Sequence, residues 1–347
     1  VLIFVLQSAS AAFTPTFQAT IPDILPQEDR YTRALSLSRL AYDLENIISP
    51  TMAAILLVFV SYQALFFGTV IGFVGSALLV VSVLLPSPEE TTRRGIYDRT
   101  TRGLRIYLAT PRLRGLLSLN LAAAAAGAMV LVNTVVLVRS DLGFDDTRVA
   151  IALAAFGSGS MLAALVLPRL LDHRPDRPVM IGGAAVLVVI LLGLALMTVI
   201  NGVGWTVLLA GWLVIGVGYS TILTPSGRLL KRSAHPEDRP AVYAAQFALS
   251  HACWLVTYPL AGWLMTVAGA ATAFVTLAVL AAIGLAGALV FWPKREAEVL
   301  QHTHENLTDD HPHVRHGRSH AHPYIIDDHH PHWPPVTKAG YPNTGDE

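Results

Sequence analysis

The chain has 347 residues, of which 53% are hydrophobic and only 14% are charged, and its 24 basic and 24 acidic side chains balance. Soluble domains carry about 25% charged residues, so this composition excludes an ordinary soluble protein and indicates a membrane protein with several spans. The zero net charge gives no reason to expect a nucleic acid as partner. A single cysteine, Cys253, allows neither a disulfide framework nor a cysteine-based metal motif.

Apolar runs predict nine membrane-spanning helices, so we expect an all-α fold, a polytopic helical bundle that contacts the lipid bilayer. Their approximate limits are 1–21, 34–60, 62–85, 115–139, 147–171, 179–200, 205–224, 241–266 and 270–292. The chain opens on Val1 inside an apolar run, without a basic stretch or a cleavage site. We therefore expect that its beginning is missing, and not that it starts with a signal peptide.

Positive charges gather in alternate loops, and this predicts the orientation of the helices. The basic loops are 22–33, 86–114, 168–178 and 228–239, and Lys294 and Arg295 follow the last span. The positive-inside rule places this set in the cytoplasm. We expect a monomer in the cell membrane (plasma or inner membrane), with its C-terminus in the cytoplasm.

The loop 86–114 is the longest between spans and divides the chain. Apolar residues lie among its arginines, which favours an amphipathic helix at the membrane interface; a plain solvated connector is the alternative. The predicted domains are the end of an N-terminal helical half (1–85), this central loop (86–114), a C-terminal six-helix half (115–293) and a tail (294–347). A protein of six plus six spans would have three further spans before residue 1.

The stretch from Arg39 to Pro50 places charges inside a predicted span, where each costs roughly 2.5–3.5 kcal/mol on insertion scales. Arg39, Asp43 and Asn46 lie at i, i+4 and i+7, on one helix face, so Arg39 and Asp43 can pair. Asp43 is the best candidate for a coupling group that gains and loses a proton. Glu45 points to another face. The alternative is a structural charge network near the helix end, where long side chains reach water.

The same stretch has a counterpart later in the chain. A loop ending Glu28-Asp29-Arg30 precedes the helix of Pro50, and a loop ending Glu237-Asp238-Arg239 precedes the helix of Pro259. Both the loop acid and the proline are offset by 209 residues (238 − 29 and 259 − 50), and Tyr42 then matches His251. Two halves with one plan are typical of transporters built from repeats.

A second polar face is predicted in the eighth span, where His251, Trp254 and Tyr258 lie at i, i+3 and i+7. Histidine carries protons and binds metals, although a histidine bonded to a backbone carbonyl is an equal alternative. We expect Gln18, Asn120 and Asn133 to make hydrogen bonds between helices. The glycine-rich stretches 157–160 and 216–218 indicate close helix packing.

The tail after Pro293 is polar and contains proline, so we expect it to be disordered. It carries ten histidines, at His302, His304, His311, His313, His316, His320, His322, His329, His330 and His332. Imidazole suits nickel, cobalt, zinc and copper, and the irregular spacing favours a flexible chelator. A biased tail with no metal role is the alternative. No other cofactor is expected.

The nine spans, the basic central loop and the echo between halves resemble the major facilitator superfamily. The run Phe13–Pro26 is similar to the fourth span and following loop of its siderophore- and metal-exporting members, and Pro50 is all that remains of the antiporter motif of the fifth span. The loop 168–177 resembles the second-half copy of the family's cytoplasmic signature, so the resemblance assigns Asp172, Arg174 and Arg177 to a gate between helices. Body and tail together resemble the nickel-resistance branch.

This resemblance implies a secondary transporter that exports a divalent metal such as nickel or cobalt against proton entry, by alternating access. The transport and coupling residues would be Arg39, Asp43, Glu45, Asn46, His251 and Tyr258. Export of a siderophore or drug-like solute by the same fold is the alternative, and a membrane metal sensor without transport is a third possibility. The chain contains none of the common hydrolase, metalloprotease or phosphate-loop motifs, so we do not expect an enzyme.

Overall fold

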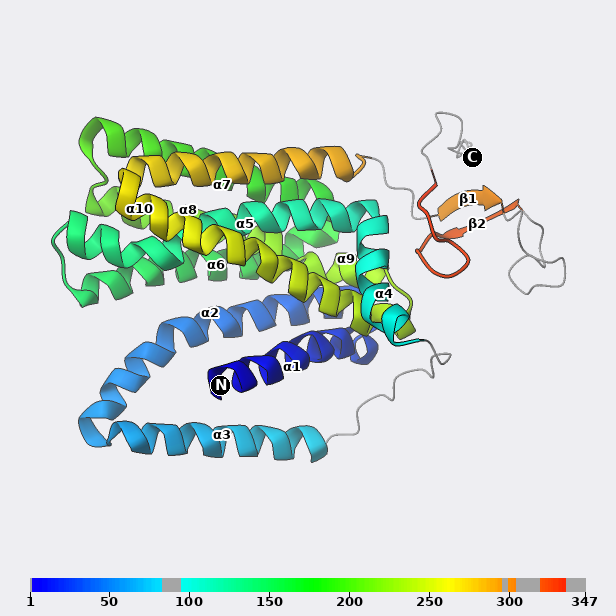
Figure 1. Ribbon diagram of the computed structural model, residues 1–347, viewed down its shortest axis with the longest axis horizontal. Coiled ribbons are helices and arrows are strands. Elements are labelled where there is room, and N and C mark those ends of the chain that lie inside the picture. The colour runs from blue at the N-terminus through cyan, green and yellow to red at the C-terminus, as the bar shows by residue number, and fades with distance from the viewer. Residues whose placement is uncertain (1, 83–94, 295–298, 304–318, 335–347) are drawn as a thin grey trace.

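The computed structural model describes residues 2–82, 95–294, 299–303 and 319–334. Long helices dominate this part of the chain (Figure 1). They are α1 (Leu2–Ile24), α2 (Glu28–Phe59), α3 (Tyr62–Ser82), α4 (Ile96–Ala109), α5 (Pro111–Val135) with a π-helical end (Val136–Asp141), α6 (Asp146–His173), α7 (Asp176–Asn201), α8 (Trp205–Leu223), α9 (Ser226–Arg232) and α10 (Arg239–Phe291). A short 3-10 helix, η2 (Pro236–Asp238), precedes α10.

All nine predicted spans are helical in the residues that the structure describes. The last two both lie within α10. This helix is interrupted at Gly269, where φ is +79° and the chain reverses direction. Six helical stretches in the described residues are long and apolar enough to cross a membrane: Gln63–Ser82, Pro111–Asp141, Asp146–His173, Asp176–Asn201, Trp205–Arg232 and Pro236–Phe291. Helices α1 and α2 are not among them, and some of their side chains lie outside the residues that the structure describes.

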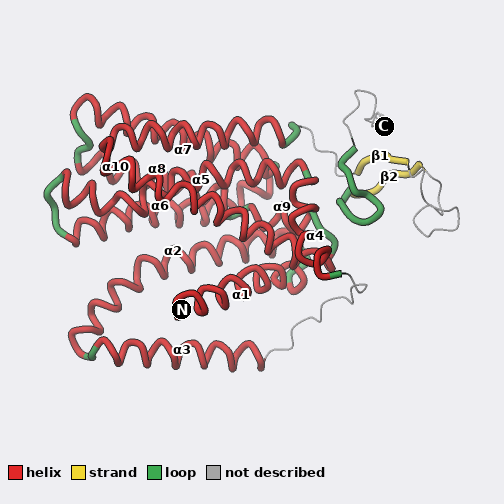
Figure 2. Tube along the Cα trace, viewed as in Figure 1, coloured by secondary structure: helices red, strands yellow, loops and turns green. Residues whose placement is uncertain are grey.

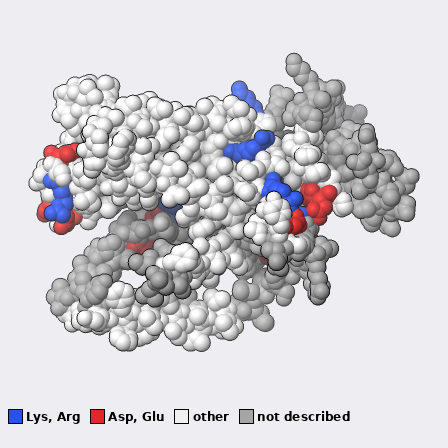
Figure 3. Space-filling view, in the orientation of Figure 1, with Lys and Arg blue, Asp and Glu red and all other residues white. Residues whose placement is uncertain are grey.

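The helices form two groups, which we call the first half (α1–α3) and the second half (α5–α10). They meet where α2 packs on α6 and where α1 packs on α9 and α10. The ribbon of α2 diverges from the second half toward the loop that joins it to α3, and α3 runs apart from the second half along its length (Figures 1 and 2). On the face drawn in Figure 3, most charged side chains gather at the two ends of the bundle and the middle is largely uncharged, as a membrane protein requires.

The second half has a tightly packed core around α5. Five consecutive alanines of that helix, residues 122–126, are almost fully buried, because small side chains let neighbouring helices approach closely. Trp212 of α8 packs edge-on against Phe274 and donates a hydrogen bond to Thr134 Oγ1 at 2.8 Å, which satisfies its buried N–H. Asn133 donates to the carbonyl of Ala261 at 3.1 Å, which is the inter-helix bond expected of it.

The predicted helix in the central loop is present as α4, and one of its faces is buried against α10. Gly103 lies so close to Ala241 that a Cβ would come within 2.0 Å of its carbonyl oxygen. The buried residues Arg102, Ile106 and Tyr107 lie on that side of the helix, while Leu104 and Leu108 are exposed. The helix therefore has the expected amphipathic pattern, but its buried face packs on protein.

The tail differs from the disorder expected for it, in the part that the structure describes. Strands β1 (Val299–Thr303) and β2 (Ser319–Pro323) pair in antiparallel register, with His302 opposite His320. Tyr324 and Ile326 are then buried, at 7% and 4% exposed. These apolar residues among the histidines give the segment a small core. The tail as a whole is polar, so its average composition did not predict this core.

Candidate functional site: a buried ion pair between the two halves

The predicted pair on α2 is present. Arg39 Nη2 lies 2.9 Å from Asp43 Oδ1, one helical turn away, and Asp43 is only 3% exposed. Arg39 also donates a hydrogen bond from Nε to Ser160 Oγ of α6 at 3.1 Å, so the pair reaches across to the second half. Asp43 Oδ2 is buried without a hydrogen-bond partner among the described residues. A buried carboxylate oxygen without a partner is costly, which marks this site as one where a proton or a ligand would be stabilised.

Aromatic rings surround the pair. The guanidinium of Arg39 lies over the rings of Tyr219 and Tyr42, with Cζ 4.9 Å and 5.2 Å from the ring centroids. Tyr219 of α8 packs against Trp254 of α10, which packs against Tyr258 at 4.8 Å between centroids. These contacts stabilise the cation electrostatically and present aromatic surface between the halves.

Two of the predicted coupling residues, Glu45 and His251, lie apart from the pair. Glu45 is exposed, in keeping with the other helix face expected for it. The side chain of Asn46 lies outside the described residues. His251 is exposed, its Nδ1 is 2.8 Å from the carbonyl oxygen of Phe247, and its ring packs at a tilt of 32° against that of Phe247. This is the backbone-bonded alternative weighed for His251, whereas Trp254 and Tyr258 of the same predicted face do reach the aromatic cluster.

A second charged site lies where the basic loops meet, at the end of the bundle that we call the basic end. Asp176, which opens α7, is 4% exposed and pairs with Arg228 at 2.9 Å and with Arg232, both on α9. Arg228 also pairs with Glu28 of α2 at 2.6 Å and donates to Thr32. The network therefore joins two helices of the second half to the start of α2 in the first half.

Further contacts close the basic end between the halves. Asp23, at the end of α1, pairs with Arg239, at the start of α10. The hydroxyls of Tyr31 and Tyr243 share a buried hydrogen bond of 2.7 Å, and Lys231 Nζ donates to the carbonyl of Pro26 at 2.7 Å. The two loops that echo each other in the sequence thus lie side by side here.

The gate residues expected from the signature loop are placed next to this network, not in it. Asp172 and Arg174 are exposed, and Arg177 donates from Nε to the carbonyl of Trp292 at 2.9 Å. Asp176 was not among the residues expected from the sequence. A signal was available: an acid at the first position of a helix favours pairing with cations, and Arg228 and Arg232 are spaced i, i+4 so that both can face it.

The structure describes the side chains of five tail histidines, and they gather near the basic end. His320 and His322 stack at 5.2 Å between ring centroids, His330 lies edge-on to His322 at 5.1 Å, and His329 and His332 are exposed. No group of three or more histidine, cysteine, aspartate or glutamate side chains arranged to hold a metal ion occurs among the described residues. The side chains of His302, His304, His311, His313 and His316 lie outside them.

Sequence comparison now decides the family. The model of the Major Facilitator Superfamily matches residues 1–203 and, in a second match, residues 116–325. The chain belongs to the Major Facilitator Superfamily. Residues 116–203 are matched twice, as expected where the two halves of a fold are repeats of each other. No curated protein matches the chain.

Membership of this family indicates the general activity and architecture of the protein. Proteins of the Major Facilitator Superfamily are secondary transporters built from two bundles of helices, with the substrate site between them near the middle of the membrane. The Arg39–Asp43 pair lies between the two halves of this chain, where such a site is expected. The chain is therefore a multi-pass membrane protein of a transporter family, and not a member of an enzyme family.

Proposed function

We propose that this chain is an exporter that couples outward movement of a solute to inward movement of protons by alternating access. The observation that carries the proposal is the buried Asp43, which is paired on one oxygen and whose other oxygen has no hydrogen-bond partner among the described residues. When a proton binds to the other oxygen of Asp43, the carboxyl group loses its charge and its ion pair with Arg39 can break. Because Arg39 also bonds Ser160 across the halves, a change at Asp43 alters the contact between them.

In this proposal the basic end faces the cytoplasm, as the positive-inside rule predicts, and the network around Asp176 is the cytoplasmic gate. Opening that end requires Glu28 to separate from Arg228 and Asp23 to separate from Arg239. Each of these pairs joins one residue of the first half to one of the second. Movement of the two halves around a central site is the mode of action expected of the fold.

Two substrate classes have support from different parts of the molecule. The central site favours an organic solute with aromatic or hydrogen-bonding groups, because Tyr219, Trp254 and Tyr258 supply ring surface and Arg39 supplies a positive charge that repels a bare metal cation. The histidines of the tail favour a divalent metal such as nickel or cobalt. We place the organic solute first for the central site and keep metal export as the second candidate.

A transport assay separates the two. The complete protein is reconstituted in proteoliposomes with an imposed proton gradient, and flux is followed for nickel, for cobalt and for a panel of aromatic organic solutes. We expect proton-driven movement of an organic solute that Asp43→Asn abolishes, because asparagine cannot exchange a proton. Asp141→Asn is the matched control, since Asp141 is an exposed acid beyond α5.

Each outcome has a consequence. Nickel or cobalt flux that needs Asp43 would make the metal candidate correct and the organic candidate wrong. Equal flux in the unchanged protein and in Asp43→Asn would rule out Asp43 as the coupling group. Metal binding by the tail without flux of any solute would favour the membrane sensor over a transporter.

A further inference from the structure

The part of the tail that the structure describes after the gap, residues 319–334, is held against the body of the protein, and we call it the docked tail segment. It is organised internally by Tyr324, which packs edge-on against Trp333 at 5.3 Å and donates a hydrogen bond to the carbonyl of His332 at 2.8 Å. Trp333 in turn lies under the guanidinium of Arg112, the second residue of α5, at 5.7 Å. Apolar burial and a cation–π contact thus attach one side of the segment.

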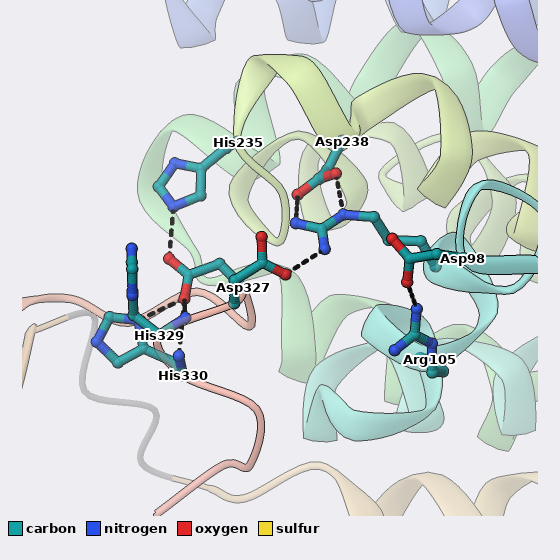
Figure 4. A network of polar contacts seen from close by, with 9 residues as sticks. Asp98, Arg105, His235, Asp238, Asp327, His329 and His330 are labelled. Atoms are coloured by element: carbon teal, nitrogen blue, oxygen red, sulfur yellow. Dashed lines mark hydrogen bonds and ion pairs between the residues drawn. The ribbon is translucent and has the colours of Figure 1, made fainter. Parts of the chain in front are cut away.

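The other side of the segment completes a buried ion pair. Arg102 of α4 is 7% exposed and is bidentate to Asp238, which is itself 4% exposed, with Nη2 to Oδ2 at 2.7 Å. The remaining guanidinium nitrogen, Nη1, donates to Asp328 of the docked tail segment at 2.6 Å (Figure 4). Two carboxylates therefore hold one arginine, and bidentate pairing of this kind fixes orientation as well as charge.

The neighbouring acid, Asp327, makes a second attachment. Its Oδ2 lies 3.3 Å from Nε2 of His235, in the loop between α9 and η2 (Figure 4). Its other oxygen accepts the backbone N–H groups of His329 and His330 at 2.8 Å each, which shapes the turn that presents both acids. The segment therefore acts on both ends of η2. Asp327 contacts His235, directly before η2, and Asp328 contacts Arg102, which pairs with Asp238 at the end of η2.

The residue after Asp238 belongs to the contact between the halves. Arg239 opens α10 and pairs with Asp23 of α1. Since Asp238 and Arg239 are consecutive, any contact that fixes the carboxylate of Asp238 also fixes where α10 begins and where the guanidinium of Arg239 can reach. The contacts described for the docked tail segment are with Arg102, Arg112 and His235, and through Arg102 the segment holds Asp238, the residue before Arg239.

We propose that the docked tail segment is a conformational clamp, which holds Arg102 against Asp238 and thereby favours the closed form of the basic end. The main contact is that of Asp328 with Arg102. The contacts of Asp327 with His235 and of Trp333 with Arg112 are secondary. Loss of the segment leaves Arg102 with one carboxylate instead of two, frees η2 on its His235 side, and lets the start of α10 move away from α1. The consequence for transport rests on the proposed alternating-access cycle, whereas the effect on the gate does not.

The test measures the width of the gate directly. The complete protein, with Cys253→Ser to remove the native thiol, receives spin labels at Arg30→Cys and Glu237→Cys, two exposed positions on α2 and η2. Pulsed electron spin resonance then gives the distance between the labels in lipid nanodiscs. The variant is Asp328→Arg, which sets a like charge against Arg102; the side chain of Asp328 is 58% exposed, so the fold should tolerate it. Asp141→Arg, at the opposite end, is the control.

We expect the short distance to dominate in the unchanged protein and in the control, with a small population at a longer distance. In Asp328→Arg the ratio of long to short distances should rise about two- to fivefold, the range that a partly exposed ion pair can supply. An unchanged distance distribution in Asp328→Arg, and in Asp328→Arg combined with Trp333→Ala, would overturn the clamp. So would rapid hydrogen exchange of residues 319–334 in the unchanged protein, since an undocked segment cannot hold anything. Neither result depends on flux, so the clamp can fail while the transporter assignment stands.

Discussion

Glu28 Oε1 lies 2.6 Å from Arg228 Nη2, and this pair joins the first turn of α2 to α9 across the two halves of the molecule. Arg228 is 8% exposed and also pairs with Asp176, so one arginine serves both the packing of the second half and its contact with the first. The contact between the halves at the basic end is therefore built around a shared cation. Removal of a carboxylate that pairs with such a cation should lower the stability of the protein more than removal of another acid in the same loop.

Asp176→Asn should lower stability strongly, whereas Asp172→Asn should not. Removal of one partner of a buried pair costs about 3–5 kcal/mol, and here the buried Arg228 keeps only the half-exposed Glu28 as its acidic partner among the described residues while Arg232 loses its ion pair with Asp176. Asp172 lies four residues earlier and is exposed, so its change should stay within about 0.5 kcal/mol. Thermal unfolding in detergent measures both. A larger loss for Asp172→Asn would return the gate to the residues expected from the signature loop.

Arg39→Ala should destabilise the protein by about 3–5 kcal/mol, because Asp43 is then a buried carboxylate without its cation. The matched control is Arg139→Ala. Arg139 pairs with Asp146 at 3.3 Å, but both side chains are more than half exposed, so the loss should be about 0–1 kcal/mol. Chemical unfolding of the two variants tests the contrast. Equal losses would mean that the Arg39–Asp43 pair is hydrated in the folded protein.

Gly159→Ala should destabilise the contact between α6 and α8. A Cβ at this position would lie 1.9 Å from the carbonyl oxygen of Leu213, so the helices must separate, at a cost of about 1–3 kcal/mol. Gly182→Ala in α7 meets nothing within 4 Å and should stabilise by about 0.4–1 kcal/mol through the unfolded chain. Melting temperatures of the two variants should therefore move in opposite directions, and a shared direction would contradict the packing predicted for the glycine-rich stretch 157–160.

Docking of the tail should weaken as pH rises above neutrality. The hydrogen bond to Asp327 raises the pKa of His235 above its ordinary value of 6.5, against the effect of burial, and the nearby Glu237 and Asp238 act in the same direction. Burial alone would raise the pKa of Asp327, yet its bonds to His235 and His330 hold that pKa below the ordinary 3.8. The His235 contribution is thus complete below 6.5 and is lost as pH rises through the raised pKa, while the Asp327 contribution is present above 3.8.

Hydrogen exchange of residues 319–334, corrected for the intrinsic pH dependence of exchange, measures this loss of docking. His235→Gln keeps a polar side chain but does not titrate, so its exchange should no longer change across this window. Persistence of the same pH dependence in His235→Gln would assign the effect to another group.

Several features of the candidate site could be predicted because they depend on short stretches of sequence. Arg39 and Asp43 are one helical turn apart, so helical geometry brings them together wherever α2 lies. The helix in the central loop and the break before the ninth span follow from amphipathic spacing and from Gly269. Ser160 and Tyr219 could not be predicted as partners of Arg39, because their approach depends on how α6 and α8 pack on α2.

Hydrophobicity and helical periodicity are local properties, so they are enough to predict a polytopic helical membrane protein with a charged stripe inside a span and with basic charge at one end. The pairing of Asp176 with Arg228 and Arg232, the pairing of Arg239 with Asp23 and the docking of part of the histidine-rich tail depend on the tertiary fold. Each of these contacts joins residues far apart along the chain. Such pairs are selected by the packing of whole helices, which places two charges within 3 Å and removes the water that would otherwise screen them.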